Sequence, residues 1–584
     1  MATGKALVLG DDTRSFLAIV RSLGRRGITL HAAPINFYSV ALRSRFIKKI
    51  HALHPPFDSG AEWVSSLEEL VRKENYDLVI PCSDRMLLPL HHNRHRFVGL
   101  TRLAIPATDH TDILFDKLRT RELAASLGIN LAHSIRPNQS FDAAEVFTRL
   151  GAPVVVKPRC SVRATVLQRQ EQVRIVATPE ELGAAIAGRE PSGYFFEAFF
   201  PGTGLGLSVL ADRGVILQSF QHHRVHQAPR GGSSAYRVSA PIHGDLFAAC
   251  RKVISHLNYT GVAMFEFRRD SATGNWVLLE VNARPWGSMP LPVALGVDFP
   301  FAWYQLLTTS ERVPQQSYRA GIYGRNLELD IDFAAKHLPE LGNWRQRVVF
   351  LARWFLAFHR VLIGREKIDT FAADDSASAI AECRAIASGL IQRGWEWIPG
   401  HRKVRRTLAC IKLRRAVATA VRAGKTPSIV FVCYGNICRS AFAERSLAKA
   451  MEPLANRVLV SSAGTYPIAG RSSPREAIQT ASHYSIDLTS HQSQCINDQI
   501  LDAATVLIVF DRFNLEMLKI HALKRRCPII RLGSLICAGN RGGDIHDPYG
   551  GGPAMFEHTF ALIEQGVTAL RARIYDIFLT KFPT

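Results

Sequence analysis

One short stretch of the sequence combines a nucleophile with a phosphate-binding side chain. Cys433 and Arg439 are separated by five residues in CYGNICR, which follows the apolar run SIVFVC and precedes a helix-forming segment. A strand that enters a helix through such a loop turns backbone N–H groups inward and can bind an anion there. The same field stabilises a thiolate, so Cys433 could attack phosphorus while Arg439 holds two oxygens of the transferring group.

The residues around this pair suit the same chemistry. Gly435 and Asn436 tolerate the positive φ that a tight loop needs, and Ser440 can hydrogen-bond the thiolate or cap the helix. A leaving phenol or alcohol also needs a proton. The best candidate donor is Asp547, in the glycine-rich segment HDPYGGG.

Three motifs in this order carry a family resemblance. CYGNICRS, then VSSAGT at 460 and DPYG at 547, resemble the low-molecular-weight protein tyrosine phosphatases over residues 427–584. The resemblance implies that Cys433 is the nucleophile that forms a phosphocysteine, Arg439 the transition-state clamp and Asp547 the general acid, with no metal or cofactor. The implied supporting positions are Asn436, Cys438, Ser440, Ser462, His491 and Tyr549.

The cysteines of this segment leave alternatives open. Cys438 either forms a protective disulfide with Cys433 or is a small core residue. The family's relatives include arsenate reductases, which need shuttle cysteines. Cys495, Cys527 and Cys537 match no such pattern, so a phosphatase is favoured over an arsenate reductase.

Three positions bear on the substrate of such a phosphatase. Ile437 favours phosphotyrosine over arginine phosphate, whose phosphatases tend to carry threonine there. Tyr434 directly after the nucleophile, and the run HQSQC that begins at His491, depart from the family's usual pattern. Both departures touch the rim and the support of the loop, so they concern substrate choice more than activity.

A second group of chemical residues lies in the first half of the chain. Lys117 begins the helical stretch KLRTRELAASLGIN, and Lys157 lies in the apolar strand PVVVKPR, where a cation is costly without an anion. Glu266, Glu280 and Asn282 come from the β-segments MFEFRRD and LLEVNAR. Two carboxylates and an amide are hard oxygen ligands of the kind that hold magnesium against a triphosphate.

These motifs, taken in order, resemble the ATP-grasp ligases of the carboxylate–amine type over about residues 1–310. The resemblance implies ATP and Mg²⁺, activation of a carboxylate as an acyl phosphate, and attack by an amine. The implied ATP-binding residues are Lys117, Lys157, Glu197 in the hinge strand, Gly231, Gly232 and Ser233 in a flexible loop, and Arg284; the implied metal ligands are Glu266, Glu280 and Asn282. No ribose-binding acid is evident after the hinge. The alternative is structural: Lys157 forms an ion pair, and the two glutamates are solvated strand ends.

The order of strands and helices predicts a multidomain α/β and α+β protein. We expect a pre-ATP-grasp α/β domain at 1–112, an ATP-grasp domain at 113–310, a helical extension at 311–400, a basic linker at 401–426 and a phosphatase domain at 427–584. The last of these alternates strand and helix, which predicts a separate parallel-sheet α/β domain.

The composition of the chain bears on its binding partners and on its cellular compartment. The formal net charge of +22 suits nucleic acid, membrane surface or acidic ligands, but no helix-turn-helix, zinc-finger spacing or aromatic RNA-binding signature occurs, so nucleic acid is disfavoured. Residues 402–425 are basic without an acid, which predicts a solvated linker helix or peripheral contact with anionic lipid. Scattered cysteines and the lack of a signal peptide or membrane span predict a cytoplasmic protein.

Two functions fit the fusion of these parts. One is a bifunctional enzyme that joins a tyrosine phosphatase to a ligase of small carboxylate and amine substrates. The other is a phosphatase regulated by a nucleotide-binding but non-ligating ATP-grasp module. The expected partner is a phosphotyrosine protein, by analogy a bacterial tyrosine kinase of polysaccharide export.

Overall fold

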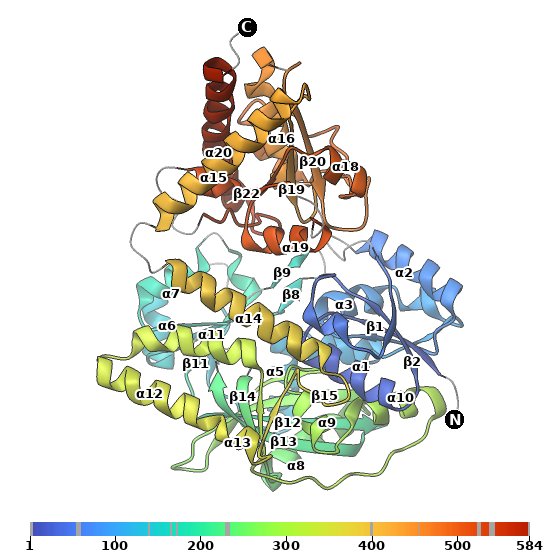
Figure 1. Cartoon of the computed structure of the whole chain (residues 1–584). Helices are drawn as coiled ribbons and strands as arrows, with labels where there is room; N and C mark the ends of the chain where they lie inside the picture. The colour runs from blue at the N-terminus through green and yellow to red at the C-terminus, as the bar shows by residue number, and fades with distance from the viewer. Residues whose placement is uncertain are drawn as a thin grey trace. The chain divides into compact units, whose positions relative to one another are not determined.

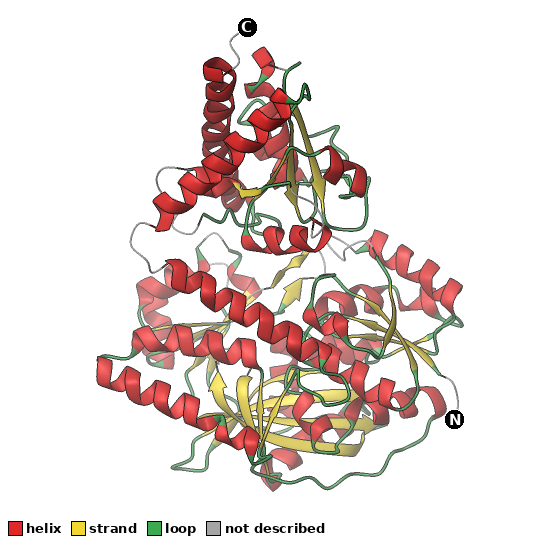
Figure 2. Cartoon of the chain, in the orientation of Figure 1, coloured by secondary structure: helices red, strands yellow, loops and turns green. Residues whose placement is uncertain are grey.

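The computed structural model divides the chain into two compact units, Met1–Ile386 and Ala387–Thr584 (Figure 1). The structure describes residues 4–53, 60–137, 141–163, 166–170, 173–187, 189–227, 234–396, 401–454, 456–522, 527–536 and 543–581. Figure 2 shows that helices and strands are mixed in both units, and the predicted multidomain α/β and α+β fold class is confirmed.

The first unit begins with a five-stranded parallel sheet in the order β3-β2-β1-β4-β5. Its strands are β1 (Lys5–Leu9), β2 (Thr29–Ala33), β3 (Ile47–Ile50), β4 (Leu78–Pro81) and β5 (Arg102–Leu103). The connections contain α1 (Ser15–Arg25), α2 (Ala61–Glu74) and α3 (Asp84–His92). The strands alternate with helices because short buried apolar runs such as KALVL are separated by amphipathic stretches.

Two further sheets of the first unit are antiparallel in their main part. The smaller has the order β10-β7-β11-β6, with β6 (Ser134–Ile135), β7 (Val154–Pro158), β10 (Arg174–Val176) and β11 (Tyr194–Ala198). The larger has the order β16-β15-β12-β13-β14-β17-β18. Its first five strands are β12 (Thr203–Asp212), β13 (Val215–Gln227), β14 (Ser234–Ala240), β15 (Gly261–Arg269) and β16 (Trp276–Asn282). β8 (Val162–Arg163) and β9 (Val166–Gln170) form a separate hairpin.

The region expected as a helical extension also supplies two strands to the larger sheet. These are β17 (Tyr323–Arg325), antiparallel to β14, and β18 (Glu366–Ile368), parallel to β17. Arg325 is fully buried and pairs with Glu366 at 2.6 Å and with Asp330. A buried guanidinium needs such partners, and these contacts tie the extension to the sheet.

Helices surround these sheets. Those of the middle of the chain are α4 (Thr108–Leu114), α5 (Lys117–Ser126), α6 (Ala143–Leu150), α7 (Pro179–Ile186), α8 (Gly244–His256), α9 (Pro290–Ala294) and α10 (Phe299–Thr309). The extension contains α11 (Leu327–His337), α12 (Trp344–Ala357), α13 (His359–Leu362) and α14 (Ala377–Glu396).

The second unit contains a four-stranded parallel sheet in the order β20-β19-β21-β22. The strands are β19 (Ser428–Cys433), β20 (Leu459–Gly464), β21 (Val506–Val509) and β22 (Ile529–Arg531). The helices are α15 (His401–Arg422), α16 (Arg439–Ala450), α17 (Arg475–Ser482), α18 (Asp498–Ala503), α19 (Arg512–Ala522) and α20 (Pro553–Lys581). All six residues of β19 are buried, as expected of an inner strand covered on both faces.

The stretch expected as a basic linker forms α15, which packs into the second unit. Ala409, Leu413 and Val417 recur every four residues and therefore share one helix face, and they belong to the core that contains β19 and α20. This face of α15 is thus covered by protein, whereas Val404, Leu408 and Ile411 of the same helix are 52%, 52% and 41% exposed. Among the described residues, no helix combines the length and the apolar character that a bilayer crossing requires.

One buried carboxyl of the first unit predicts a pH-dependent stability. Burial raises the pKa of Glu382 on α14 to about 7, and one of its oxygens has no partner within the described part of the chain while the other accepts from Thr370. The folded state therefore holds a proton that the unfolded state releases above pH 4.5. This contribution to stability is complete below pH 4.5 and is lost as the pH rises through about 7.

We expect Glu382→Gln to remove this slope because the amide does not titrate. The difference in unfolding free energy between the variant and the parent should change by up to about 3 kcal/mol between pH 4.5 and 8. Urea unfolding of both proteins at several pH values measures it, with exposed Glu340→Gln as the control. Parallel pH profiles for the parent and Glu382→Gln would contradict the prediction.

Candidate functional site

Cys433 lies at the carboxyl end of a central strand of the second unit. β19 pairs with β20 on one side and β21 on the other, all parallel, so the carboxyl ends of three strands meet at one edge. The segment 434–438 then leads directly into α16, which begins at Arg439. The predicted strand, loop and helix are therefore present, and ligands of such sheets bind at this edge.

Two polar groups contact the sulfur of Cys433. Its Sγ lies 3.0 Å from Ser440 Oγ, and the backbone N–H of Asn436 donates to it at 3.2 Å. Donors directed at sulfur stabilise negative charge on it. The thiol is also buried, so these contacts are not in competition with bulk water.

Asn436 fixes the shape of the loop. Its φ is +53°, in the left-handed region that Asn tolerates better than most residues. Its Nδ2 donates to Ser440 Oγ at 2.9 Å and to Ser462 Oγ at 2.7 Å. His491 Nε2 lies 2.7 Å from the Asn436 carbonyl oxygen. The structure thus brings together Asn436, Ser440, Ser462 and His491, which the sequence nominated as support.

Arg439 is the buried cation of this site, with 1% of its surface exposed. Its Nη2 donates to Asp547 Oδ2 at 2.6 Å, and its Nη1 donates to Asp511 and to the Ile545 carbonyl. Burial alone would lower the pKa of Arg439, but Asp547 and Asp511 raise it. Its Nε is buried and has no partner within the described residues, which leaves a donor for an incoming anion.

The remaining predicted residues lie close to this cation. The side chain of Asp547 is 43% exposed, so it can exchange protons with solvent, and its Oδ1 accepts from the Tyr549 N–H at 3.3 Å. Cys438 is buried, and its burial raises the pKa of its thiol. Cys433 and Cys438 are both free thiols. The disulfide stays a prediction, as does the role of Tyr549 in an aromatic slot.

Several residues of the site were missed from the sequence. Asp511 was not nominated, although it lies two residues after the end of strand β21 and therefore at the same sheet edge as Cys433. An aromatic cluster was missed as well: the Tyr434 ring lies 5.3 Å from Tyr466 and 5.5 Å from Phe513, between ring centroids. No spacing in the sequence connects these three rings, which come from separate segments.

The second candidate site lies on the larger sheet of the first unit. Glu266 on β15 and Glu280 on β16 are directly opposite each other across the strand pair. Asn282 Nδ2 bridges their carboxylates, 3.2 Å from Glu266 Oε1 and 3.3 Å from Glu280 Oε1. The three predicted metal ligands therefore converge. If the Asn282 side-chain amide is flipped, its Oδ1 takes the position of Nδ2. The three residues then present only oxygen atoms, which suit Mg²⁺.

One cation contacts each of the two glutamates. Lys117 Nζ lies 3.0 Å from Glu280, and Arg224 lies 2.6 Å from Glu266. Burial raises the pKa of Glu266, with Glu280 adding to the effect and Arg224 opposing it. Burial alone would raise the pKa of Glu280, but Lys117 lowers it. One carboxylate is thus stable as an anion, while the other would gain from a further cation.

The predicted cation Lys157 is not part of this pair. It lies on β7 of the smaller sheet, where it pairs with Glu197 of β11 and donates to the Leu279 carbonyl at 3.3 Å. Arg121 contacts the other oxygen of Glu197, which is 2% exposed. The structural ion pair weighed for Lys157 is therefore present in this structure.

Arg284 and the glycine-rich loop complete the predicted set. Arg284 donates to Asp84 of α3 and to the Pro285 carbonyl, the latter at 3.0 Å. Gly231, Gly232 and Ser233 lie outside the described residues. The ATP-binding roles of all these residues stay predictions.

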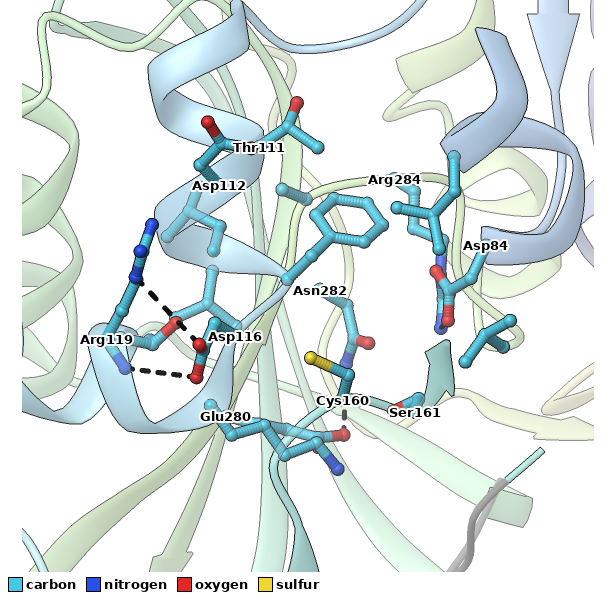
Figure 3. Close-up of a pocket in the computed structure, with 18 of the residues that line it drawn as sticks. Asp84, Thr111, Asp112, Asp116, Arg119, Cys160, Ser161, Glu280, Asn282 and Arg284 are labelled. Atoms are coloured by element: carbon cyan, nitrogen blue, oxygen red, sulfur yellow. Dashed lines mark hydrogen bonds and ion pairs between the residues drawn. The ribbon is translucent and has the colours of Figure 1, made fainter. Parts of the chain in front are cut away.

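A cavity of about 350 Å³ joins several of these side chains. Figure 3 shows Asn282 and Glu280 close together, and the paired side chains of Arg284 and Asp84 next to each other at one side of the cavity. Lys117 also lines it, and so does Phe115. The cavity combines apolar walls with convergent charged groups, which is typical of a small-molecule site.

A third group of polar residues in the first unit resembles a metal site by composition. His31, His51 and Glu74 place ligand atoms within 4.8 Å of one another. However, Lys5 and Lys49 donate to Glu74 at 2.7 and 2.6 Å, and burial lowers the pKa of His51 to about 4. The lysines already neutralise the carboxylate, so this is a buried polar network.

Comparison with known proteins identifies the C-terminal domain. The family model described as low molecular weight phosphotyrosine protein phosphatase matches residues 428–576. A phosphatase of this kind from Sus scrofa is 34% identical, and the alignment covers 25% of this chain and 93% of that protein. A probable low molecular weight protein-tyrosine-phosphatase, EpsP, from Ralstonia nicotianae is 29% identical, with 25% and 95% covered. Through this domain, the chain belongs to the low molecular weight protein-tyrosine-phosphatase family.

The N-terminal unit matches ATP-grasp proteins. A model described as ATP-grasp in the biosynthetic pathway with Ter operon matches residues 209–326. A D-alanine–D-alanine ligase from Acidiphilium cryptum is 29% identical, with 32% of this chain and 65% of that protein covered. The structure of an N5-carboxyaminoimidazole synthetase from Staphylococcus aureus complexed with ADP has a TM-score of 0.45 at 16% identity, covering 59% and 87%. The predicted combination of an ATP-grasp-like part with a tyrosine phosphatase domain is confirmed by the two family matches, and the chain is an enzyme.

Substitutions of Asn436 separate the contribution of its positive φ from that of its side-chain hydrogen bonds. Asn436→Gly keeps the positive φ but removes the side-chain hydrogen bonds, whereas Asn436→Ala removes both. We expect both variants to lower kcat, and Asn436→Ala to lose a further ~1 kcal/mol of unfolding free energy. Phosphatase kinetics and urea unfolding of the two variants measure these effects. Equal stability of the two variants would show that the backbone conformation carries no cost.

Proposed function

We propose that the C-terminal domain hydrolyses phosphotyrosine in proteins through a phosphocysteine on Cys433. The observation that carries this proposal is the position of the Cys433 sulfur. It contacts Ser440 Oγ and the Asn436 N–H, at the start of the loop that leads into the helix of buried Arg439. The aromatic cluster of Tyr434, Tyr466 and Phe513 beside the loop favours an aromatic phosphoester.

The first chemical step would transfer the phosphoryl group to the enzyme. The Cys433 thiolate forms an S–P bond as the P–O bond to the phenol breaks, and Asp547 donates its proton to the leaving oxygen. Arg439 would exchange its contact with Asp547 for phosphate oxygens and use its unpaired Nε as an additional donor.

The second step would release phosphate. Asp547, now a carboxylate, removes a proton from a water that attacks phosphorus, and the S–P bond breaks to regenerate the thiolate. Ser440 lies 3.0 Å from the sulfur and would stabilise it as the leaving group. The proposed partner is therefore a phosphotyrosine protein; a bacterial tyrosine kinase of polysaccharide export stays a prediction.

Substitution of the nucleophile and the acid tests this mechanism. We expect Cys433→Ser to abolish turnover, while Cys527→Ser, a free cysteine on another segment, leaves it unchanged. Asp547→Asn should lower kcat for a phosphotyrosine peptide by about 10²- to 10⁴-fold. The loss should be smaller for para-nitrophenyl phosphate, whose leaving group needs little protonation. Steady-state kinetics with both substrates measure these effects.

Two results would overturn the proposal. Turnover by Cys433→Ser would exclude the phosphocysteine. An inactive parent that still binds phosphate would instead favour a binding module or an arsenate reductase, which arsenate with a thiol donor would distinguish.

We also propose that the N-terminal unit is an ATP-dependent carboxylate–amine ligase. The convergence of Glu266, Glu280 and Asn282 beside the cavity supports this, as do the family match and the nearby Lys117. These three residues would hold Mg²⁺, which when bound supplies positive charge to the phosphates of ATP. Lys117 and Arg284 would then bind the nucleotide or the acyl phosphate through their cationic groups.

Nucleotide binding tests this second proposal. We expect Mg-ATP to bind the full chain, and Glu280→Gln to weaken binding by at least about tenfold because a metal ligand is lost. Glu145→Gln is the matched control, since this glutamate lies on the exposed helix α6. Isothermal titration with and without Mg²⁺ measures the affinity. ADP release that requires an added amine would establish the ligase, whereas binding without turnover would favour the regulatory module, and no binding would contradict both.

A further inference from the structure

The helices α12 and α13 expose an unusual amount of apolar surface. Eight of the 24 large apolar side chains that are exposed in the described part of the chain lie between residues 344 and 363. We define the exposed α12–α13 surface by its most exposed members, which are Trp344 (69%), Val348 (54%), Phe355 (63%), Leu356 (69%), Leu362 (88%) and Ile363 (59%). Contiguous exposed apolar surface of this kind marks an interaction site.

Three of these residues lie on one face of α12. Trp344, Val348 and Phe355 follow one another by four and seven residues, which returns each to nearly the same helix face, and Leu362 is the last residue of the short helix α13 that follows. The helix α12 is about 21 Å long. In Figure 1, α12 lies at the periphery of the first unit.

The opposite side of the same helices is anchored. Trp354 Nε1 donates to Asp330 Oδ2 at 2.8 Å, and the Phe350 ring packs near His337 of α11. Arg325 stacks over the Phe358 ring at 4.3 Å. The helices are therefore held to the domain by one face, and the outer apolar face is not needed for that attachment.

The charge of this segment selects its partner. Residues 341–365 contain five arginines, Arg345, Arg347, Arg353, Arg360 and Arg365, and no aspartate or glutamate. Two copies of the chain packed face to face would bring these like charges together, which opposes self-association. An anionic lipid surface attracts them, and long arginine side chains can reach the headgroups while the apolar residues enter the acyl boundary.

We propose that α12 and α13 bind the surface of an anionic phospholipid bilayer, lying in its interface. Trp344, Phe355 and Leu362 insert into the boundary between headgroups and acyl chains. Arg345 and Arg353 contact the headgroup phosphates; Arg345 also lies over the Trp344 ring at 5.7 Å, which orients the pair.

Vesicle co-sedimentation of the full chain tests the proposal. Vesicles of phosphatidylcholine with phosphatidylglycerol should retain the parent protein, and vesicles of phosphatidylcholine alone should retain much less. We expect Phe355→Asp combined with Leu362→Asp to reduce the partition coefficient by roughly tenfold or more. The matched control is Leu459→Asp with Leu579→Asp, whose side chains are 57% and 72% exposed on the second unit.

The charge contribution is tested separately. Arg345→Gln with Arg353→Gln should weaken binding to the anionic vesicles only, and binding of the parent should fall as salt increases. Trp344 provides a direct probe: the blue shift of fluorescence on vesicle binding should be smaller in Trp344→Phe. Circular dichroism of each variant verifies that it is folded.

Three outcomes would overturn the proposal. One is the absence of binding to anionic vesicles by the folded parent. Another is binding that the Phe355→Asp, Leu362→Asp variant leaves unchanged. The third is a concentration-dependent dimer of the parent, in sedimentation velocity, that the same variant abolishes, because it would assign this surface to a second copy of the chain.

Discussion

The phosphatase site depends on a guanidinium that is almost completely removed from water. Arg439 is stable there only because Asp511 and Asp547 compensate its charge. The same requirement brings the loop of Asp547 to the start of α16, directly after the loop that follows Cys433. The charge balance that makes burial of Arg439 tolerable therefore also gathers the residues proposed for catalysis, although Arg439 and Asp547 are separated by more than 100 positions in the chain.

In the candidate site of the first unit, the buried charges that need compensation are negative. Glu266 and Glu280 lie opposite each other on adjacent strands, so their charges repel unless cations are near. Lys117 and Arg224 provide one cation for each glutamate. Lys157 is instead committed to Glu197. The two glutamates therefore lie side by side because each is paired with its own cation, and Asn282 bridges them.

The two units use different architectures to present their residues. Parallel strands in the second unit bring Cys433 and Asp511 to one edge because all carboxyl ends point the same way. Antiparallel strands in the first unit bring Glu266 and Glu280 to one face through register. The outer side of α12 has neither role, since its exposed apolar residues contribute to no core of the described chain.

The sequence alone determined the residues of the loop CYGNICR, because these residues are close together in the chain. The geometry of the loop depends on the strand before it and the helix after it, which all lie within a short stretch of sequence. It also indicated both domains, since hydrophobic periodicity and motif order survive without coordinates. It could not reveal Asp511, the rings of Tyr466 and Phe513, or the pairing of Lys157 with Glu197. These depend on which strands are neighbours and in which register, a choice made by long-range packing. The sequence also predicted a linker at the stretch that forms α15. One face of this basic helix packs into the core of the second unit, and only the tertiary structure shows the surface against which it packs.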